Sequence, residues 1–206
     1  MKTKKLLFYL LAAILGGCLP IASINPLYTE KDLTFEDKLS GTWVNDHNDP
    51  NEKDEFWQFK PVEGPPKAYE LVLYENNKTM GIFDAYLLKI KGQTFLDVIP
   101  NQFPDKNTDS DEMELPFNAF FFIPVHTFLK INQIGPELKM QIIDEDDVEK
   151  MLKSDPNIIE YEKAEDRIVL TAGTKDLQDF ITKHQDKLFG ETVIFVKSKP
   201  NDPNKN

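Results

Sequence analysis

The residues of this chain that could do chemistry are few and scattered. Cys18 is the only cysteine, and the three histidines, His47, His126 and His184, lie far apart in the sequence. A catalytic nucleophile needs a base beside it, and the sequence has no Gly-x-Ser-x-Gly turn that would present one. It has no His-x-x-x-His or cysteine spacing typical of zinc either. We therefore expect no enzymatic activity, no metal and no cofactor.

Two aspartates stand out because each lies in the middle of an apolar run. Asp84 lies in the run IFDAY and Asp97 in the run FLDVI, and a hairpin through Gly92 would place both on one face of a sheet. A carboxylate turned inward needs a partner or a ligand, because unpaired burial is costly. The alternative is that both point into solvent. His126, close to Val125 and Phe128, is typical of a histidine buried in a core or sheet.

Cys18 ends a short segment that has the layout of an export signal. Three lysines precede an apolar run over residues 6–15, which is half the roughly 20 residues of a membrane-spanning helix. Leu15-Gly16-Gly17-Cys18 then resembles the lipobox of bacterial prolipoproteins. The resemblance implies cleavage after Gly17, a diacylglyceryl group on the Cys18 thiol, and a further acyl chain such as palmitate on the freed amine.

Lipidation would use the only thiol and would fix the location of the protein. Two or three acyl chains anchor a protein stably, whereas one chain does not. We therefore expect a lipid-anchored protein of the bacterial cell envelope. Leu19 follows Cys18, whereas an aspartate there retains lipoproteins of enteric bacteria in the inner membrane, so the outer membrane is favoured.

Charge and composition divide the rest of the chain. Removing Lys2, Lys4 and Lys5 with the signal changes the net charge from −11 to −14, and such an acidic chain is not expected to bind nucleic acid. We expect a signal peptide over 1–17, a lipidated cysteine and tether over 18–38, one β-rich domain over 39–199, and a disordered tail over 200–206.

The domain is expected to be mostly β with two short helices. Runs typical of strands, separated by turn residues, cover residues 41–45, 55–62, 69–76, 80–91, 94–100, 120–133, 138–144, 158–162, 168–172 and 192–197. Helical spacing of apolar residues predicts helices over 145–153 and, after a cap at Thr174, about 175–188. This pattern indicates a β-barrel or a strongly curved antiparallel sheet.

Gly41-Thr42-Trp43 on the first of these strands resembles the opening motif of the lipocalin and calycin barrels. The element order, with a late helix and a short closing strand, is also similar. The resemblance implies that Trp43 plugs one end of a barrel and that a late basic residue packs across it. Arg167, the only arginine, is the expected partner.

Two functions are the main candidates. A third and less favoured one is an enzyme that uses Asp84, Asp97 and a histidine. The first is a binding protein that holds a small apolar or amphipathic ligand in a pocket of the barrel. Its candidate ligand-binding residues are Trp43, Asp84, Asp97, Phe120, Phe121 and Phe122. The alternative is a packed interaction module, without a ligand cavity, that docks another envelope protein; the phenylalanines would then be core residues.

Overall fold

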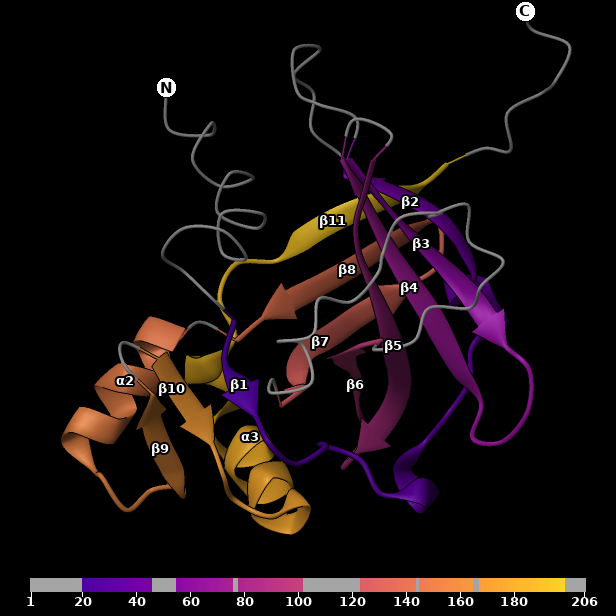
Figure 1. Ribbon diagram of the computed structural model, residues 1–206. Helices are drawn as coiled ribbons and strands as arrows, with labels where there is room; N and C mark the ends of the chain where they lie inside the picture. Colours follow the sequence, from indigo (N-terminus) through magenta and orange to yellow (C-terminus); the bar gives the residue numbers. More distant parts are fainter. Residues whose placement is uncertain are drawn as a thin grey trace, which may run out of the picture.

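The chain folds into a closed barrel of eight antiparallel strands with a smaller module beside it (Figure 1). The computed structural model describes residues 20–45, 55–75, 78–101, 123–143, 145–164 and 167–198. Around the barrel the strands follow the order β11 (Val193–Lys197), β2 (Gly41–Asn45), β3 (Glu55–Val62), β4 (Ala68–Glu75), β5 (Lys78–Ile90), β6 (Gln93–Pro100), β7 (Thr127–Ile134) and β8 (Glu137–Ile142). The expected fold class, mostly β with two helices, is confirmed, and the sheet closes into a barrel.

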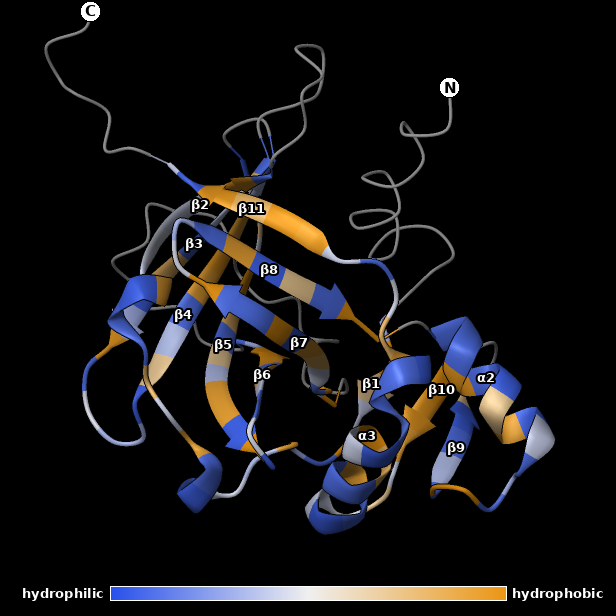
Figure 2. Ribbon diagram, turned by 180° about the vertical axis from the view of Figure 1, so that it is seen from behind, coloured by the Kyte–Doolittle hydropathy of each residue, from blue (hydrophilic) through white to orange (hydrophobic). Residues whose placement is uncertain are grey.

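Alternation along the strands builds the barrel interior. In β8, Leu138 and Met140 are buried while Lys139 and Gln141 are more exposed, and the bands alternate along this strand in Figure 2. An eight-stranded barrel is just wide enough for side chains to fill it. The buried residues that pack together here form the barrel core: Leu39, Trp43, Phe59, Tyr69, Leu71, Leu73, Ala85, Leu87, Leu96, Val98, Leu129, Ile131, Leu138, Met140 and Phe195.

The tight turn between β5 and β6 sets the register of the pair. Lys91 and Gly92 both have positive φ values, 49° and 82°, and Ile90 pairs with Gln93 across the turn. Positive φ at both central positions is the geometry that matches the twist of a two-residue hairpin. Gly92 therefore makes the hairpin that its sequence predicts.

Trp43 is part of the barrel core, and the basic side chain beside it is not that of Arg167. Trp43 is fully buried and its Nε1 donates to the carbonyl of Leu39 at 2.7 Å. The ammonium of Lys197 lies 5.2 Å from the centre of its ring. Gly41 has φ of 122°, and a Cβ there would lie 3.0 Å from Cε of Lys197. The glycine thus leaves room for the lysine to cross the tryptophan.

Arg167 lies instead in a smaller α/β module. This module comprises β1 (Ala22–Ser23), α2 (Glu145–Ser154), β9 (Tyr161–Ala164), β10 (Arg167–Leu170) and α3 (Thr174–Leu188). Its three strands form a separate sheet in the order β1-β10-β9, with β1 parallel to β10. The runs at 158–162 and 168–172 were therefore expected in the wrong sheet. Short strands bounded by helices carry no signal that assigns them to the barrel.

The segment expected to be a tether is part of the folded domain. We call residues 20–39 the N-terminal strap; it includes β1 and the short 3-10 helices η1 (Glu30–Asp32) and η2 (Asp37–Leu39). Ile21 and Leu27 are fully buried. The backbone pairs with β10 at β1, and the amide of Thr34 donates to the carbonyl of Leu87 at 2.8 Å. The tether prediction was wrong because the strap contacts are made with residues distant in sequence.

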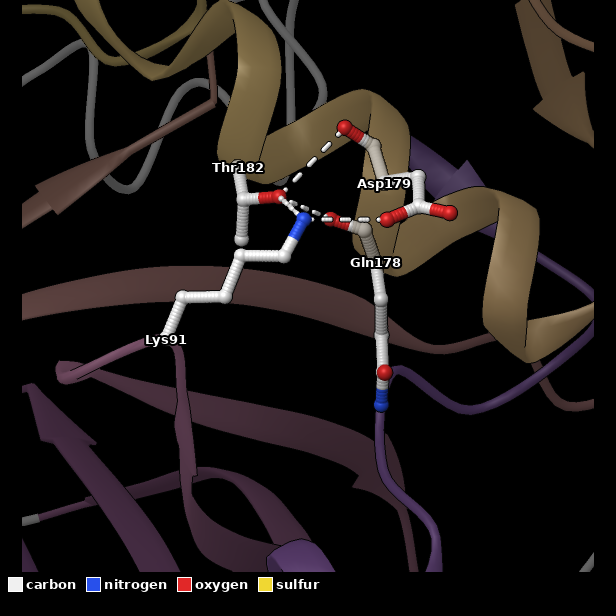
Figure 3. Close-up of polar contacts among 4 residues, drawn as sticks. All are labelled: Lys91, Gln178, Asp179 and Thr182. Carbon is white, nitrogen blue, oxygen red and sulfur yellow. Dashed lines mark hydrogen bonds and ion pairs between the residues drawn. The ribbon is translucent and has the colours of Figure 1, made fainter.

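Helix α3 connects the strap to the barrel (Figure 3). At the β5–β6 turn, Lys91 Nζ lies 3.0 Å from Oδ1 of Asp179 and 3.1 Å from Oγ1 of Thr182. From the same helix, Gln178 Nε2 donates to the carbonyl of Leu27 at 2.8 Å and to Oδ2 of Asp32 at 2.9 Å. One helix face thus holds two parts of the molecule that are far apart in sequence.

Candidate functional site

A buried polar pair lies where the N-terminal strap crosses β6 and β7. Asp97 of β6 is fully buried, and its Oδ1 lies 2.6 Å from Nδ1 of His126. Its Oδ2 accepts a hydrogen bond from the amide of Leu27 in the strap at 2.7 Å. Ser23 is also fully buried, and it exchanges two backbone hydrogen bonds with His126, of 2.9 and 2.8 Å. The pair therefore ties the strap to the outer wall of the barrel.

The electrostatics of this pair follow from its burial. Burial raises the pKa of the Asp97 carboxyl, whereas the contact with His126 and the hydrogen bond from Leu27 act in the opposite direction. A carboxylate without these partners would be costly at this depth. Both oxygens of Asp97 are thus occupied by the protein itself.

Asp84 lies on the same outer face of the barrel but is less buried. Asp97 pairs with Tyr86 across β5 and β6, and Asp84 lies two residues before Tyr86, so the two aspartates share a face as expected. Nδ2 of Asn101 donates to Asp84 at 3.0 Å. Burial raises the pKa of Asp84, the nearby charge of Glu70 raises it further, and the Asn101 hydrogen bond lowers it.

The two aspartates differ, and for Asp97 neither alternative was right as stated, because the strap was not expected to cover this face. They turn away from the barrel core, yet Asp97 is enclosed rather than solvated. Trp43 and Asp97 therefore hold structural positions, and neither is accessible to a ligand. Phe120, Phe121 and Phe122, like Cys18, lie outside the described residues.

The predicted environment of His126, a buried position in a sheet, is confirmed. His126 is 7% exposed and does meet Asp97. The nearby hydroxyl of Ser23 donates to the carbonyl of Asn25 at 2.8 Å rather than to the imidazole. Within the described ranges, no cluster of three or more histidine, cysteine, aspartate or glutamate side chains is placed to hold a metal ion.

A surface groove lies between the strap and the turn that joins β3 to β4. It has a volume of about 730 Å³, within the range of small-molecule sites. The residues that line it are Glu30, Leu33, Thr34, Phe35, Pro65, Pro66 and Lys67. Its walls combine apolar side chains with one acidic and one basic residue. It is open to solvent, and it is separate from the buried Asp97–His126 pair.

Phe35 forms the fixed wall of this groove. Its ring stacks on Tyr69 with centres 4.7 Å apart and planes 6° apart. The Tyr69 hydroxyl accepts from the amide of Glu36 at 2.8 Å and donates to its carbonyl at 3.0 Å, and burial raises the pKa of Tyr69 to about 12. Lys67 places its ammonium 5.2 Å from the centre of the Phe35 ring. The wall is thus held from the barrel core and carries a cation at its rim.

The sequence did not single out any residue of the groove. Four of its residues lie in the segment taken for a tether, and the others lie in a turn. The only available signal was the placement of Leu33 and Phe35 in a segment otherwise rich in charge, together with the Pro65-Pro66 pair. Neither feature indicates a groove until the strap and the turn are brought together.

Comparison with known proteins gives no match from which a function could be inferred. No protein-family model, no curated protein and no solved structure matches it. In the part of the chain that the structure describes, no helix has the length and apolar character needed to cross a membrane.

Proposed function

We propose that this chain is a lipid-anchored protein of the bacterial envelope whose groove binds a small amphipathic molecule. The barrel serves as the rigid scaffold of the groove, and acylated Cys18 serves as the anchor. The groove is the single observation that carries the binding proposal. This proposal differs from the sequence-based hypothesis because it places the ligand outside the barrel, against Phe35, rather than against Trp43 and Asp97.

The lining of the groove indicates the chemistry of the ligand. Leu33, Phe35 and the two prolines offer an apolar surface, and Lys67 offers a cation at its edge. A molecule with an apolar body and an anionic group matches both features. Lys67 is exposed, so solvent screens its attraction for the anion, which would contribute about 1 kcal/mol or less.

A fluorescent apolar sulfonate, 8-anilinonaphthalene-1-sulfonate, tests the groove. It should bind the folded domain at one saturable site, and Lys67→Glu should weaken binding about tenfold, the equivalent of about 1.4 kcal/mol. Lys153→Glu on α2, remote from the groove, is the matched charge reversal and should leave the affinity unchanged. Absence of a saturable site, or equal loss in both variants, would refute the groove as a binding site.

The anchor is tested separately. Growth with a fatty-acid analogue should label the wild-type protein, and Cys18→Ser should remove the label and leave unprocessed precursor or a released soluble form. Label that persists on Cys18→Ser would show that the lipid is attached elsewhere.

The packing of the barrel favours a second candidate, a module that docks another envelope protein. Aliphatic and aromatic side chains pack together in the barrel core, and the ring centres of Trp57 and Phe195 lie 5.0 Å apart and those of Phe59 and Tyr69 6.1 Å apart. A photoreactive amino acid in place of Glu30, used in intact cells, distinguishes the two. A discrete protein adduct would favour docking, whereas its absence together with saturable dye binding would favour the small molecule.

A further inference from the structure

The first residues that the structure describes already belong to the folded core. Ile21 is fully buried and Ala22 is 3% exposed. The carbonyl of Pro20 accepts a hydrogen bond from Nη2 of Arg167 at 3.1 Å, and β1 pairs with β10 directly afterwards. The folded part of the chain therefore begins no later than Pro20.

This leaves almost no chain between the domain and the proposed anchor. Leu19 is the only residue between Cys18 and Pro20. Two residue steps span at most about 7 Å. A flexible tether of about 20 residues would instead have a root-mean-square span of roughly 25 Å. A lipid on Cys18 would thus bring Pro20 to the level of the lipid head groups.

We infer that the α/β module lies directly on the membrane surface. This inference rests on the proposed acylation of Cys18. The contact surface is the edge of the three-stranded sheet that runs across the strand ends, where β1 and β10 begin and β9 ends. Arg167 pairs with Ala164 across β10 and β9. Since neighbouring strands lie about 4.8 Å apart, the end of β9 is within roughly 10 Å of Pro20.

The side chains near this edge are consistent with a membrane contact that is held by the lipid anchor and not by electrostatic attraction. Glu162 and Lys163 on β9 carry opposite charges, and Lys163 lies 3.8 Å from Glu149 of α2. Among the described residues of this edge, the side chains therefore form neither a basic patch for anionic lipids nor a purely acidic one that would be repelled. The partner it fits is the head-group layer of the bilayer in which the lipid is inserted.

The same geometry orients the groove away from the membrane. The strap leads from β1 past the barrel to η1 and then to β2, and the β3–β4 turn lies on the side opposite β9 and β10 (Figures 1 and 2). Because the module is held at the bilayer, the groove opens to the aqueous side. Its ligand would then arrive through water rather than from the lipid phase.

Fluorescence quenching on vesicles tests the contact. The full-length acylated protein is inserted into phosphatidylcholine vesicles that contain a phosphatidylcholine with a nitroxide on its head group. With the thiol of Cys18 acylated, an introduced cysteine is the only free thiol, so Lys163→Cys and Lys67→Cys each carry one fluorophore. Both lysines are exposed. Quenching should be several-fold stronger at position 163 than at position 67.

A linker insertion supplies the control. About 20 Gly/Ser residues placed between Leu19 and Pro20 should reduce quenching at position 163 to the level at position 67, because the tether regains its span. The mass of the N-terminal peptide reports acylation in each sample. Equal quenching at both positions in an acylated protein would overturn the inference and leave the lipoprotein proposal intact. An unmodified Cys18 would overturn both.

Discussion

The barrel core and the strap interface are both buried, yet they are built from different interactions. The barrel core consists of apolar side chains that alternate along paired strands, and the polar atoms of Trp43 and Tyr69 donate to backbone carbonyls of Leu39 and Glu36. The strap interface contains the buried polar residues Ser23, Asp97 and His126. Each of these has a hydrogen-bond partner inside the protein.

The two interfaces differ in how strictly they require particular packing partners. An apolar interior tolerates changes of partner if volume is kept, whereas a buried carboxylate is stable only where its particular partners are present. The alternation of apolar and polar residues along the strands is therefore sufficient to stabilise the barrel. The strap, which has few residues of its own in regular structure, is held in one register by Asp97, His126 and Gln178.

The largest effect is expected from the barrel core. Trp43→Ala should lower the free energy of unfolding by about 4 kcal/mol, because it leaves a large cavity in a fully buried site. Trp43→Phe, which keeps most of the volume and loses the hydrogen bond to Leu39, should cost clearly less. Urea denaturation followed by circular dichroism measures both. Equal losses would mean that the hydrogen bond, not packing, dominates.

Removing Asp97 from the strap interface is expected to lower the free energy of unfolding almost as much as removing Trp43 from the barrel core. Asp97→Ala should lower the free energy of unfolding by about 3 kcal/mol, because it leaves His126 and the Leu27 amide without their buried partner. Asp84→Ala is the matched control and should cost about 1 kcal/mol, since it loses one partly exposed hydrogen bond. A neutral Asp97→Ala would show that the pair does not hold the strap.

Gln178→Ala should loosen the strap without weakening the barrel. It removes the two hydrogen bonds to Leu27 and Asp32, worth about 1 kcal/mol, so the Leu27 amide should exchange with solvent about fivefold faster. Amides of β4 and β5 serve as the internal control and should exchange at their wild-type rates. A uniform increase across all amides would mean that strap and barrel open together.

Asp84 should make stability depend on pH in a defined direction. Its pKa is higher in the folded protein than in the unfolded chain, so the folded state binds more protons between the two values. The contribution of Asp84 is therefore fully present below about pH 4 and is lost as pH rises through the folded pKa. Relative to Asp84→Asn, the wild-type protein should lose stability with rising pH. The opposite slope in paired urea titrations would contradict the raised pKa.

The smallest effect is expected at the contact between the β5–β6 turn and α3. Both Lys91 and Asp179 are more than half exposed, so solvent screens their ion pair. Lys91→Met should leave the Tm within the error of a thermal melt. A clear decrease would show that α3 depends on this pair for its position and would make the turn part of the strap interface.

Local pattern determined the barrel. The strand runs at 41–45 and 55–62 match β2 and β3, and Gly92 identified the hairpin because two positive φ values are needed there. Trp43 lies on the first of these strands and is fully buried, because an apolar residue within an alternating strand has one buried face to occupy. Side-chain periodicity and turn chemistry act over a few residues, so the sequence alone expresses them.

Only the tertiary structure decided what covers the outside of the barrel. The polar strap residues between Ile21 and Leu39 show no periodicity, and their partners, Asp97, His126 and Gln178, lie about 70 to 150 residues further along the chain. The choice of Lys197 over Arg167 beside Trp43 depends on which strand closes the barrel. The groove likewise exists only where strap and turn meet. These are contacts between distant segments, and residue types alone do not specify which distant segments will meet.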